Sequence, residues 1–188
     1  ERGKTVASGL CPHHGEPSQA VSSLLEEIKG SLSGKSLKGA VTGTEGRKRI
    51  TLPEIIAAEA LEKALDALSL SPKAVVSMGG EDLVVYPMQG GRIQGTIAGN
   101  KCASGTGEFF RQQLGRMDMG LDDLASLTGD EKVLPLSCRC SVFMKSDCTH
   151  RLNKGEASPK DIALSLCKVM ADKVSAYIIK ARIEEGEV

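Results

Sequence analysis

The stretch Lys101–Phe110, which reads KCASGTGEFF, places a cysteine just before two glycines and the expected start of a helix. A second cysteine, Cys140, opens the segment CSVFMKS 38 residues after Cys102. Helix N-termini concentrate unpaired N–H groups and positive dipole, so both positions suit an anionic thiolate or the anionic cluster that it ligates. An iron–sulfur cubane usually takes four thiolates, and one chain offers two such positions. The two cysteine positions therefore predict a cluster shared across a symmetric homodimer.

Composition limits the classes of protein that this chain can belong to. The 24 Lys and Arg residues balance the 24 Asp and Glu residues, so no net field attracts nucleic acid or an anionic membrane. No run approaches the roughly 18 apolar residues of a membrane span, and no apolar signal region follows Glu1. We therefore expect a cytoplasmic protein without a nucleic-acid or membrane partner, whose six cysteines are reduced thiols, some of them ligands.

Apolar periodicity and glycine-rich turns predict alternating strands and helices. Strands are expected over residues 4–10, 38–42, 73–78, 82–87 and 92–98, with 133–136 as a further candidate. Helices are expected over residues 17–31, from 53 to about 68, and over 108–116, 121–127, 141–152 and 159–182. At the last helix, Ser158 is the expected N-cap, followed by Pro159 and then by Asp161 in the first turn. The alternation predicts an α/β protein with two lobes, residues 1–72 and 73–188.

Two glycine segments are candidates for a nucleotide site. Gly79-Gly80-Glu81-Asp82 follows an expected strand and could place backbone amides and carboxylates beside phosphate and its magnesium ion. The alternative is a plain hairpin turn, for which Gly-Gly plus an acid is common. Gly105-Thr106-Gly107 precedes a helix and can cradle an anion through backbone N–H groups, although a short Gly-x-Gly is a weak signal.

The remaining thiols support a competing hypothesis of structural zinc. Cys138, Cys140, Cys148 and His150 together offer the sulfur and nitrogen ligands of a tetrahedral site. If residues 141–152 are helical, Cys148 lies more than two turns from Cys140, too far to share one ion. Cys138 could instead replace Cys140 as a cluster ligand, and Cys167 is expected to be a core thiol.

With these residues in view, the chain resembles the BadF/BadG/BcrA/BcrD-type ATPase family, the activators of 2-hydroxyacyl-CoA dehydratases and their benzoyl-CoA reductase relatives. The likeness rests on residues 12–15 (PHHG), 41–43 (VTG), 54–60, 78–81 (MGGE), 100–110 and 140–143 (CSVF). It implies an actin-like, sugar-kinase-like α/β fold of two ribonuclease H-like lobes. We expect this fold to be incomplete at both ends, without the phosphate loop that would precede Glu1 and the adenosine turn that would follow Val188.

The resemblance also implies a function and its cofactors. In such an activator Cys102 and Cys140 ligate one 4Fe-4S cluster at the two-fold axis of a homodimer. ATP hydrolysis with Mg²⁺ then drives a low-potential electron onto a dehydratase or related CoA-ester reductase. Ser77 and Val84 stand where the family usually has aspartate and lysine. These departures favour the alternative of a non-catalytic actin-like scaffold or interaction module.

Overall fold

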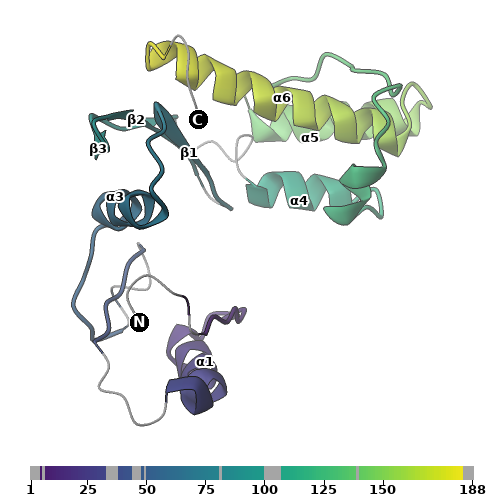
Figure 1. Cartoon of the computed structure of the whole chain (residues 1–188). Helices are drawn as coiled ribbons and strands as arrows, with labels where there is room; N and C mark the ends of the chain where they lie inside the picture. Colours follow the sequence, from purple (N-terminus) through teal and green to yellow (C-terminus); the bar gives the residue numbers. More distant parts are fainter. Residues whose placement is uncertain are drawn as a thin grey trace. The chain divides into compact units, whose positions relative to one another are not determined.

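A computed structural model describes residues 5, 7–32, 38–43, 48, 50–80, 82–99, 107–138 and 140–183 (Figure 1). The chain divides into two compact units, Glu1–Leu70 and Ser71–Val188. The first unit contains helices α1 (Pro17–Leu32) and α3 (Ala57–Leu68). The second contains β1 (Ala74–Met78), β2 (Leu83–Gln89), β3 (Arg92–Ile93), β4 (Ile97–Ala98), α4 (Gly107–Gly115), the 3-10 helix η2 (Asp122–Ser126), α5 (Ser141–Asn153) and α6 (Pro159–Lys180).

In the first unit, the structure confirms the predicted helix at residues 17–31 and corrects three other predictions. Residues 7–10 form no strand, and Leu10 is 97% exposed, so the apolar side chains there are not covered by a sheet. The strand predicted at 38–42 is reduced to one parallel bridge between Val41 and Glu54. The helix predicted from Pro53 begins only at Ala57, because the Val41 N–H donates to the Pro53 carbonyl (2.9 Å) and keeps this segment extended.

In the second unit, the sheet is built around β2, which pairs antiparallel with β1, β3 and β4. The predicted hairpin is confirmed, since Gly90 and Gly91 join β2 to β3 with φ of 57° and 75°. The strand expected at 92–98 is split in two. The register shifts by one residue between Met88↔Ile93 and Val85↔Ile97, and such an extra residue locally disrupts pairing.

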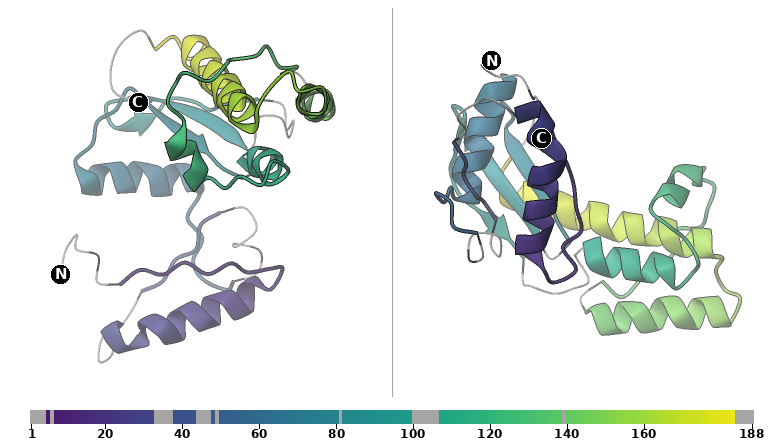
Figure 2. Two further views of the ribbon diagram at one scale, coloured as in Figure 1. Left: turned by 90° about the vertical axis from the view of Figure 1, so that its right-hand side faces the viewer. Right: turned by 90° about the horizontal axis from the view of Figure 1, so that it is seen from below.

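Helices α4, α5 and α6 run side by side, as Figure 1 and Figure 2 show, and an apolar core lies among them. The buried members of this core are Phe109, Leu136, Met144, Cys148, Ile162 and Leu166. Helix α6 also contacts β2 and β4 of the sheet. The helices at 108–116, 141–152 and 159–182 are thus confirmed, whereas the predicted helix at 121–127 is the short 3-10 helix η2.

The predicted strand at 133–136 is wrong, and its hydrogen bonds give the reason. The Lys132 N–H donates to Asp161 Oδ1 (2.8 Å), and the Leu134 N–H donates to Ser165 Oγ (2.9 Å). Two backbone donors in and beside this segment are therefore satisfied by side chains of α6 rather than by a neighbouring strand.

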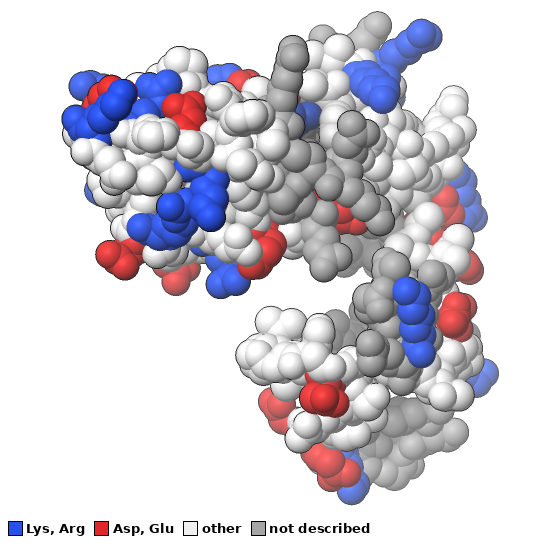
Figure 3. Space-filling model, turned by 180° about the vertical axis from the view of Figure 1, so that it is seen from behind, with Lys and Arg blue, Asp and Glu red and all other residues white. Residues whose placement is uncertain are grey.

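Charged side chains of both signs are interspersed over the second unit on the face in Figure 3, in line with the balanced composition. Within the described part of the chain, no helix is long and apolar enough to cross a membrane.

Candidate functional site

The glycine turn after β1 meets the start of α4. The Gly107 N–H donates to the Gly79 carbonyl and the Glu108 N–H donates to the Gly80 carbonyl, both at 3.0 Å. The structure therefore brings together two segments that the sequence offered separately as nucleotide ligands. Of the other candidates, Asp82 lies in the same turn, where its carbonyl accepts from the Gly79 N–H at 2.9 Å. Glu81, Gly105 and Thr106 lie outside the described residues.

This contact is close enough to favour glycine at position 107. A Cβ added to Gly107 would lie 3.0 Å from the Gly79 oxygen and 3.7 Å from Gly80 Cα. Both neighbours are backbone, which cannot move aside as a flexible side chain does. The close approach of the helix to the turn thus depends on the absence of a side chain there.

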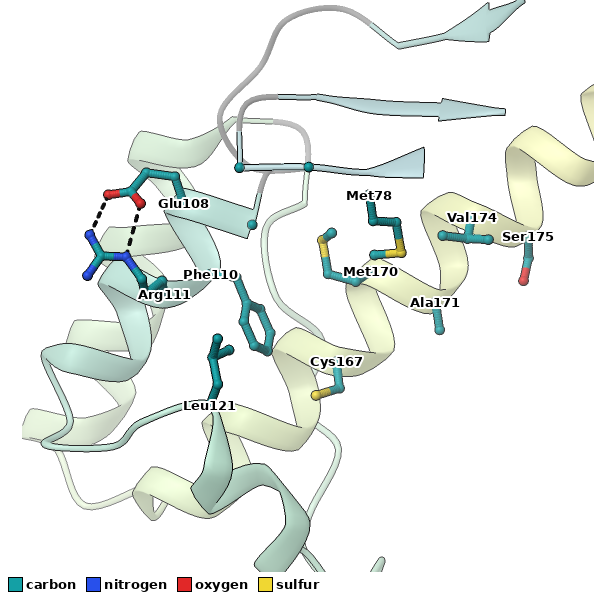
Figure 4. Close-up of a pocket in the computed structure, with 13 residues that line it drawn as sticks. Met78, Glu108, Phe110, Arg111, Leu121, Cys167, Met170, Ala171, Val174 and Ser175 are labelled. Atoms are coloured by element: carbon teal, nitrogen blue, oxygen red, sulfur yellow. Dashed lines mark hydrogen bonds and ion pairs between the residues drawn. The ribbon is translucent and has the colours of Figure 1, made fainter. Parts of the chain in front are cut away.

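A cavity of about 770 Å³ opens beside the glycine contact. It is lined by Met78, Gly79, Gly80, Gly107, Glu108, Phe110, Arg111, Leu121, Cys167, Met170, Ala171, Val174 and Ser175. Figure 4 shows Phe110 and Leu121 on one side of the cavity and residues of α6 on the other. The wall is therefore mainly apolar, and the backbone of Gly79, Gly80 and Gly107 forms part of it.

An ion pair of α4 lies at the rim of this cavity (Figure 4). Arg111 Nη2 lies 2.9 Å from Glu108 Oε1, and Arg111 Nε lies 3.0 Å from Glu108 Oε2. Hydrogen bonds from Arg111 and Gln112 lower the pKa of Glu108, so this carboxylate is charged at neutral pH. Sequence reasoning missed the pair, although the i,i+3 spacing of opposite charges on an expected helix is the signal that could have revealed it.

Cys140 is the N-cap of α5 and is partly buried. Its backbone is extended (φ −135°, ψ 131°) and its side chain makes no capping hydrogen bond. Cys140 therefore lies at the N-terminus of α5, where the sequence predicted it. Cys102, the predicted second ligand, lies outside the described residues, and Cys138 is exposed.

The other predicted thiols have different surroundings. Cys148 is buried in the core, and burial raises its pKa to about 11, so it remains a neutral thiol at neutral pH. Cys167, expected in the core, is only partly buried and lines the cavity; burial raises its pKa also. In the described part of the chain no three His, Cys, Asp or Glu side chains are grouped to hold a metal ion. The structure therefore gives no support to the zinc hypothesis.

Comparison with known proteins identifies the family. The model of the BadF/BadG/BcrA/BcrD ATPase family matches residues 14–188. The chain belongs to this family. It is 30% identical over 101 residues to the (R)-2-hydroxyglutaryl-CoA dehydratase activating ATPase of Acidaminococcus fermentans, a match that covers 53% of this chain and 38% of that protein. It is 24% identical over 118 residues to the 2-hydroxyisocaproyl-CoA dehydratase activator of Clostridioides difficile, covering 62% of this chain and 44% of that protein.

A solved structure extends the likeness to the fold. The activator of the 2-hydroxyisocaproyl-CoA dehydratase from Clostridium difficile, with bound ADPNP, matches with a TM-score of 0.77 at 22% identity. That match covers 97% of this chain and 68% of the activator. The fold is therefore the actin-like α/β fold that the sequence predicted. The chain spans less than half the length of each of these two curated relatives.

Proposed function

We propose that the chain is part of an activator-type ATPase. It binds ATP or ADP with Mg²⁺ at the glycine contact and passes a low-potential electron to a 2-hydroxyacyl-CoA dehydratase or related CoA-ester reductase. The observation that carries this proposal is the backbone contact of Gly79 and Gly80 with the start of α4, in a family whose curated members include dehydratase activators.

We place the phosphates of a nucleotide beside the glycine contact rather than on its N–H groups. The N–H groups of Gly107 and Glu108 already donate to carbonyls, so their role is to fix the turn against the helix. The N-terminal end of α4 still carries a partial positive charge beside the turn, which favours a phosphate group. Support also comes from the Clostridium difficile activator, whose structure contains ADPNP.

The cavity beside the contact suits the nucleoside. Its volume of about 770 Å³ is within the range of pockets for small molecules, about 300–1,000 Å³. Phe110, Met170 and Val174 supply an apolar wall for a planar base. The charged rim formed by Glu108 and Arg111 supplies polar groups that orient a ligand.

The electron-transfer part of the proposal rests on Cys140 and Cys102, with Cys138 as a possible substitute for Cys140. A 4Fe-4S cluster, when bound, supplies one-electron chemistry at a potential tuned by neighbouring dipoles. Cys140 offers a thiol at the N-terminus of α5, where the helix dipole stabilises negative charge. Cys102 and Cys140 supply two thiolates per chain, whereas such a cluster usually takes four, so a second copy of the chain would complete the site as a homodimer.

Position 84 favours a second candidate, a module that has lost hydrolysis. Val84 is buried in β2 and paired with Ser77 of β1, so the place where the family usually has lysine belongs here to the apolar core. A full-length protein that hydrolyses ATP at a measurable rate would contradict this second candidate.

The nucleotide site is tested by two glycine substitutions on the same helix. We expect Gly107→Ala to weaken Mg-ATP binding by about tenfold or more, since its Cβ would force the Gly79 carbonyl away. Gly115→Ala is the matched control, because a Cβ there would meet nothing within 4 Å. Isothermal titration of the full-length protein measures both. Equal affinities for the two variants, or no binding by the unaltered protein, would overturn the assignment.

The cluster is tested separately by anaerobic reconstitution, with iron and sulfide analysis and EPR of the reduced protein. We expect a cluster that is lost in Cys102→Ser and in Cys140→Ser. A cluster that survives both substitutions together would show that these residues are not its ligands.

A further inference from the structure

A smaller cavity, of about 140 Å³, lies between the C-terminal ends of α4 and α5. Its polar side chains are Gln113, Arg116, Thr149 and Asn153, and the rest of its lining is Cys148 with three apolar side chains. Among the described residues that line it, none is acidic. A water molecule takes up about 30 Å³ in the liquid, so the cavity has room for a ligand the size of roughly four waters.

Gln113 brings a buried hydrogen-bond donor to this cavity. The residue is only 4% exposed, and its Oε1 accepts from Arg116 Nη1 at 3.5 Å. This bond turns the other end of the planar amide, the Nε2 group, away from the cation. Within the described part of the chain, Gln113 Nε2 donates to no protein acceptor. A buried donor without an acceptor is costly, so the cavity favours a ligand that brings acceptor oxygen atoms.

Arg116 adds a positive charge at the same place. Its Nη2 donates to Thr149 Oγ1 at 3.0 Å, and the Thr149 hydroxyl donates in turn to the Lys145 carbonyl at 2.8 Å. The guanidinium is thus held between α4 and α5, and no described carboxylate pairs with it. Water could satisfy the Gln113 amide, but only an anion would also use the charge of Arg116.

We propose that this cavity binds a small oxyanion, a phosphate or a carboxylate group, through the side chains of Gln113, Arg116 and Asn153. The site is separate from the glycine contact and does not depend on the proposed function.

The helix ends beside the cavity do not rule out an anion there. The C-terminal end of a helix carries partial negative charge, which repels an anion where its last carbonyls are unpaired. Here the Gly115 carbonyl of α4 accepts from the Asp118 N–H at 3.3 Å, and the Leu152 carbonyl of α5 accepts from the Gly155 N–H at 3.0 Å. The chain itself therefore occupies these carbonyls, and the Arg116 charge offsets what remains of the two helix dipoles.

The experiment is isothermal titration of the full-length, nucleotide-free protein with inorganic phosphate and, separately, with acetate. We expect Gln113→Leu to weaken phosphate binding by about tenfold or more, because leucine has a similar size but no donor. Gln112→Leu is the matched control, since the neighbouring Gln112 is exposed and donates to Glu108 instead. Arg116→Gln should also weaken binding, because it removes the charge. Circular dichroism checks that each variant is folded.

The outcomes separate this site from the proposed nucleotide site. An unaltered protein that binds no phosphate would show that the cavity holds only water, and equal affinities in Gln113→Leu and Gln112→Leu would also overturn the inference. Phosphate binding that is lost in Gly107→Ala but kept in Gln113→Leu would overturn it while the proposed function stands. Acetate binding that depends on Gln113 would support a site for carboxylates as well as phosphates. Binding of phosphate alone with this dependence would support a phosphate site.

Discussion

The N-terminal ends of α5 and α6 differ in whether the side chain of the N-cap residue bonds to the first-turn N–H groups. At α6, Ser158 Oγ accepts from the Asp161 N–H (3.2 Å) while Asp161 Oδ2 accepts from the Ser158 N–H (2.8 Å), a complete capping box. At α5, Cys140 occupies the N-cap and makes no side-chain capping hydrogen bond. The amides at the start of α6 are thus stabilised from within the chain. Those at the start of α5 have no hydrogen bond from the side chain of the N-cap residue.

Helix α5 is instead held by packing and by bonds further along the helix. Met144 and Cys148 are buried, and Asp147 accepts from the Ser137 N–H at 3.1 Å. Arg151 pairs with Asp147 at 2.8 Å and donates to the Pro135 carbonyl at 3.0 Å. The position of Cys140 therefore depends on these anchors rather than on a cap.

The largest effect is expected from the core anchor of α5. Met144→Ala should lower the free energy of unfolding by about 2–4 kcal/mol, because it removes a fully buried side chain and leaves a cavity. Phe143→Ala, the exposed neighbour, should change it by less than about 0.5 kcal/mol. Urea unfolding of the cluster-free protein measures both. Equal losses for the two variants would show that packing does not hold α5 in this way.

A smaller effect is expected at the start of α6. Ser158→Ala removes one half of the capping box and should lower the free energy of unfolding by about 1 kcal/mol. Ser146→Ala, at an exposed position of α5, should not lower it, because alanine is the better helix former. If both variants lose the same stability, the cap contributes nothing measurable.

At the start of α5, we expect a substitution to raise the free energy of unfolding rather than lower it. Cys140→Ser introduces a good N-cap residue, so it should raise the free energy of unfolding of the cluster-free protein by about 0.5 kcal/mol. The same variant should fail to retain a reconstituted cluster. A serine variant that is clearly less stable than the unaltered protein would mean that the Cys140 thiol has a structural role.

The sequence predicted an element correctly where the interactions that form it join residues close together in the sequence. Ser158, Pro159 and Asp161 predicted the start of α6 correctly because the capping box lies within four residues. The hairpin at Gly90 and Gly91 was also predicted correctly, because its turn depends on adjacent residues. The failures at 53–56 and 133–136 arose because their backbone groups bond to partners distant in sequence, such as Val41 and Ser165.

The candidate site shows the same division. Sequence patterns predicted Gly79, Gly80 and Gly107 as candidates for a nucleotide site. They also predicted correctly a helix that starts near Glu108. That the Gly107 N–H donates to the Gly79 carbonyl could not be predicted, because the contact depends on how α4 packs against the sheet. The cavity wall from α6 was missed for the same reason. The sequence predicted Cys167 to be a core thiol on the apolar face of its helix. No pattern in the neighbouring residues indicates the cavity that Cys167 lines.

The smallest effect that we expect is a difference between the starts of α5 and α6 in how their contribution to the free energy of unfolding depends on pH. Hydrogen bonds from the backbone N–H groups of Ser158 and Lys132 hold the pKa of Asp161 below its ordinary value of 3.8. A carboxyl group whose pKa is lower in the folded state stabilises the fold above its unfolded pKa, and this contribution disappears as the pH falls through the folded value. Helix α5 has no acidic residue in its first turn, so its start should contribute no such dependence.

The corresponding experiment compares the unaltered protein with Asp161→Asn by urea unfolding between about pH 2 and 6. Asparagine has one acceptor oxygen, so it can keep the hydrogen bond from only one of the Ser158 and Lys132 N–H groups, and the substitution removes the charge and one of these two bonds. We expect the unaltered protein to be the more stable at pH 6 and the difference to shrink as the pH falls below about 4. Other carboxylates with lowered pKa values, such as Glu131, destabilise both proteins equally in acid and cancel in the difference. A difference that stays constant over this range would mean that the ionised form of Asp161 is not what stabilises the start of α6.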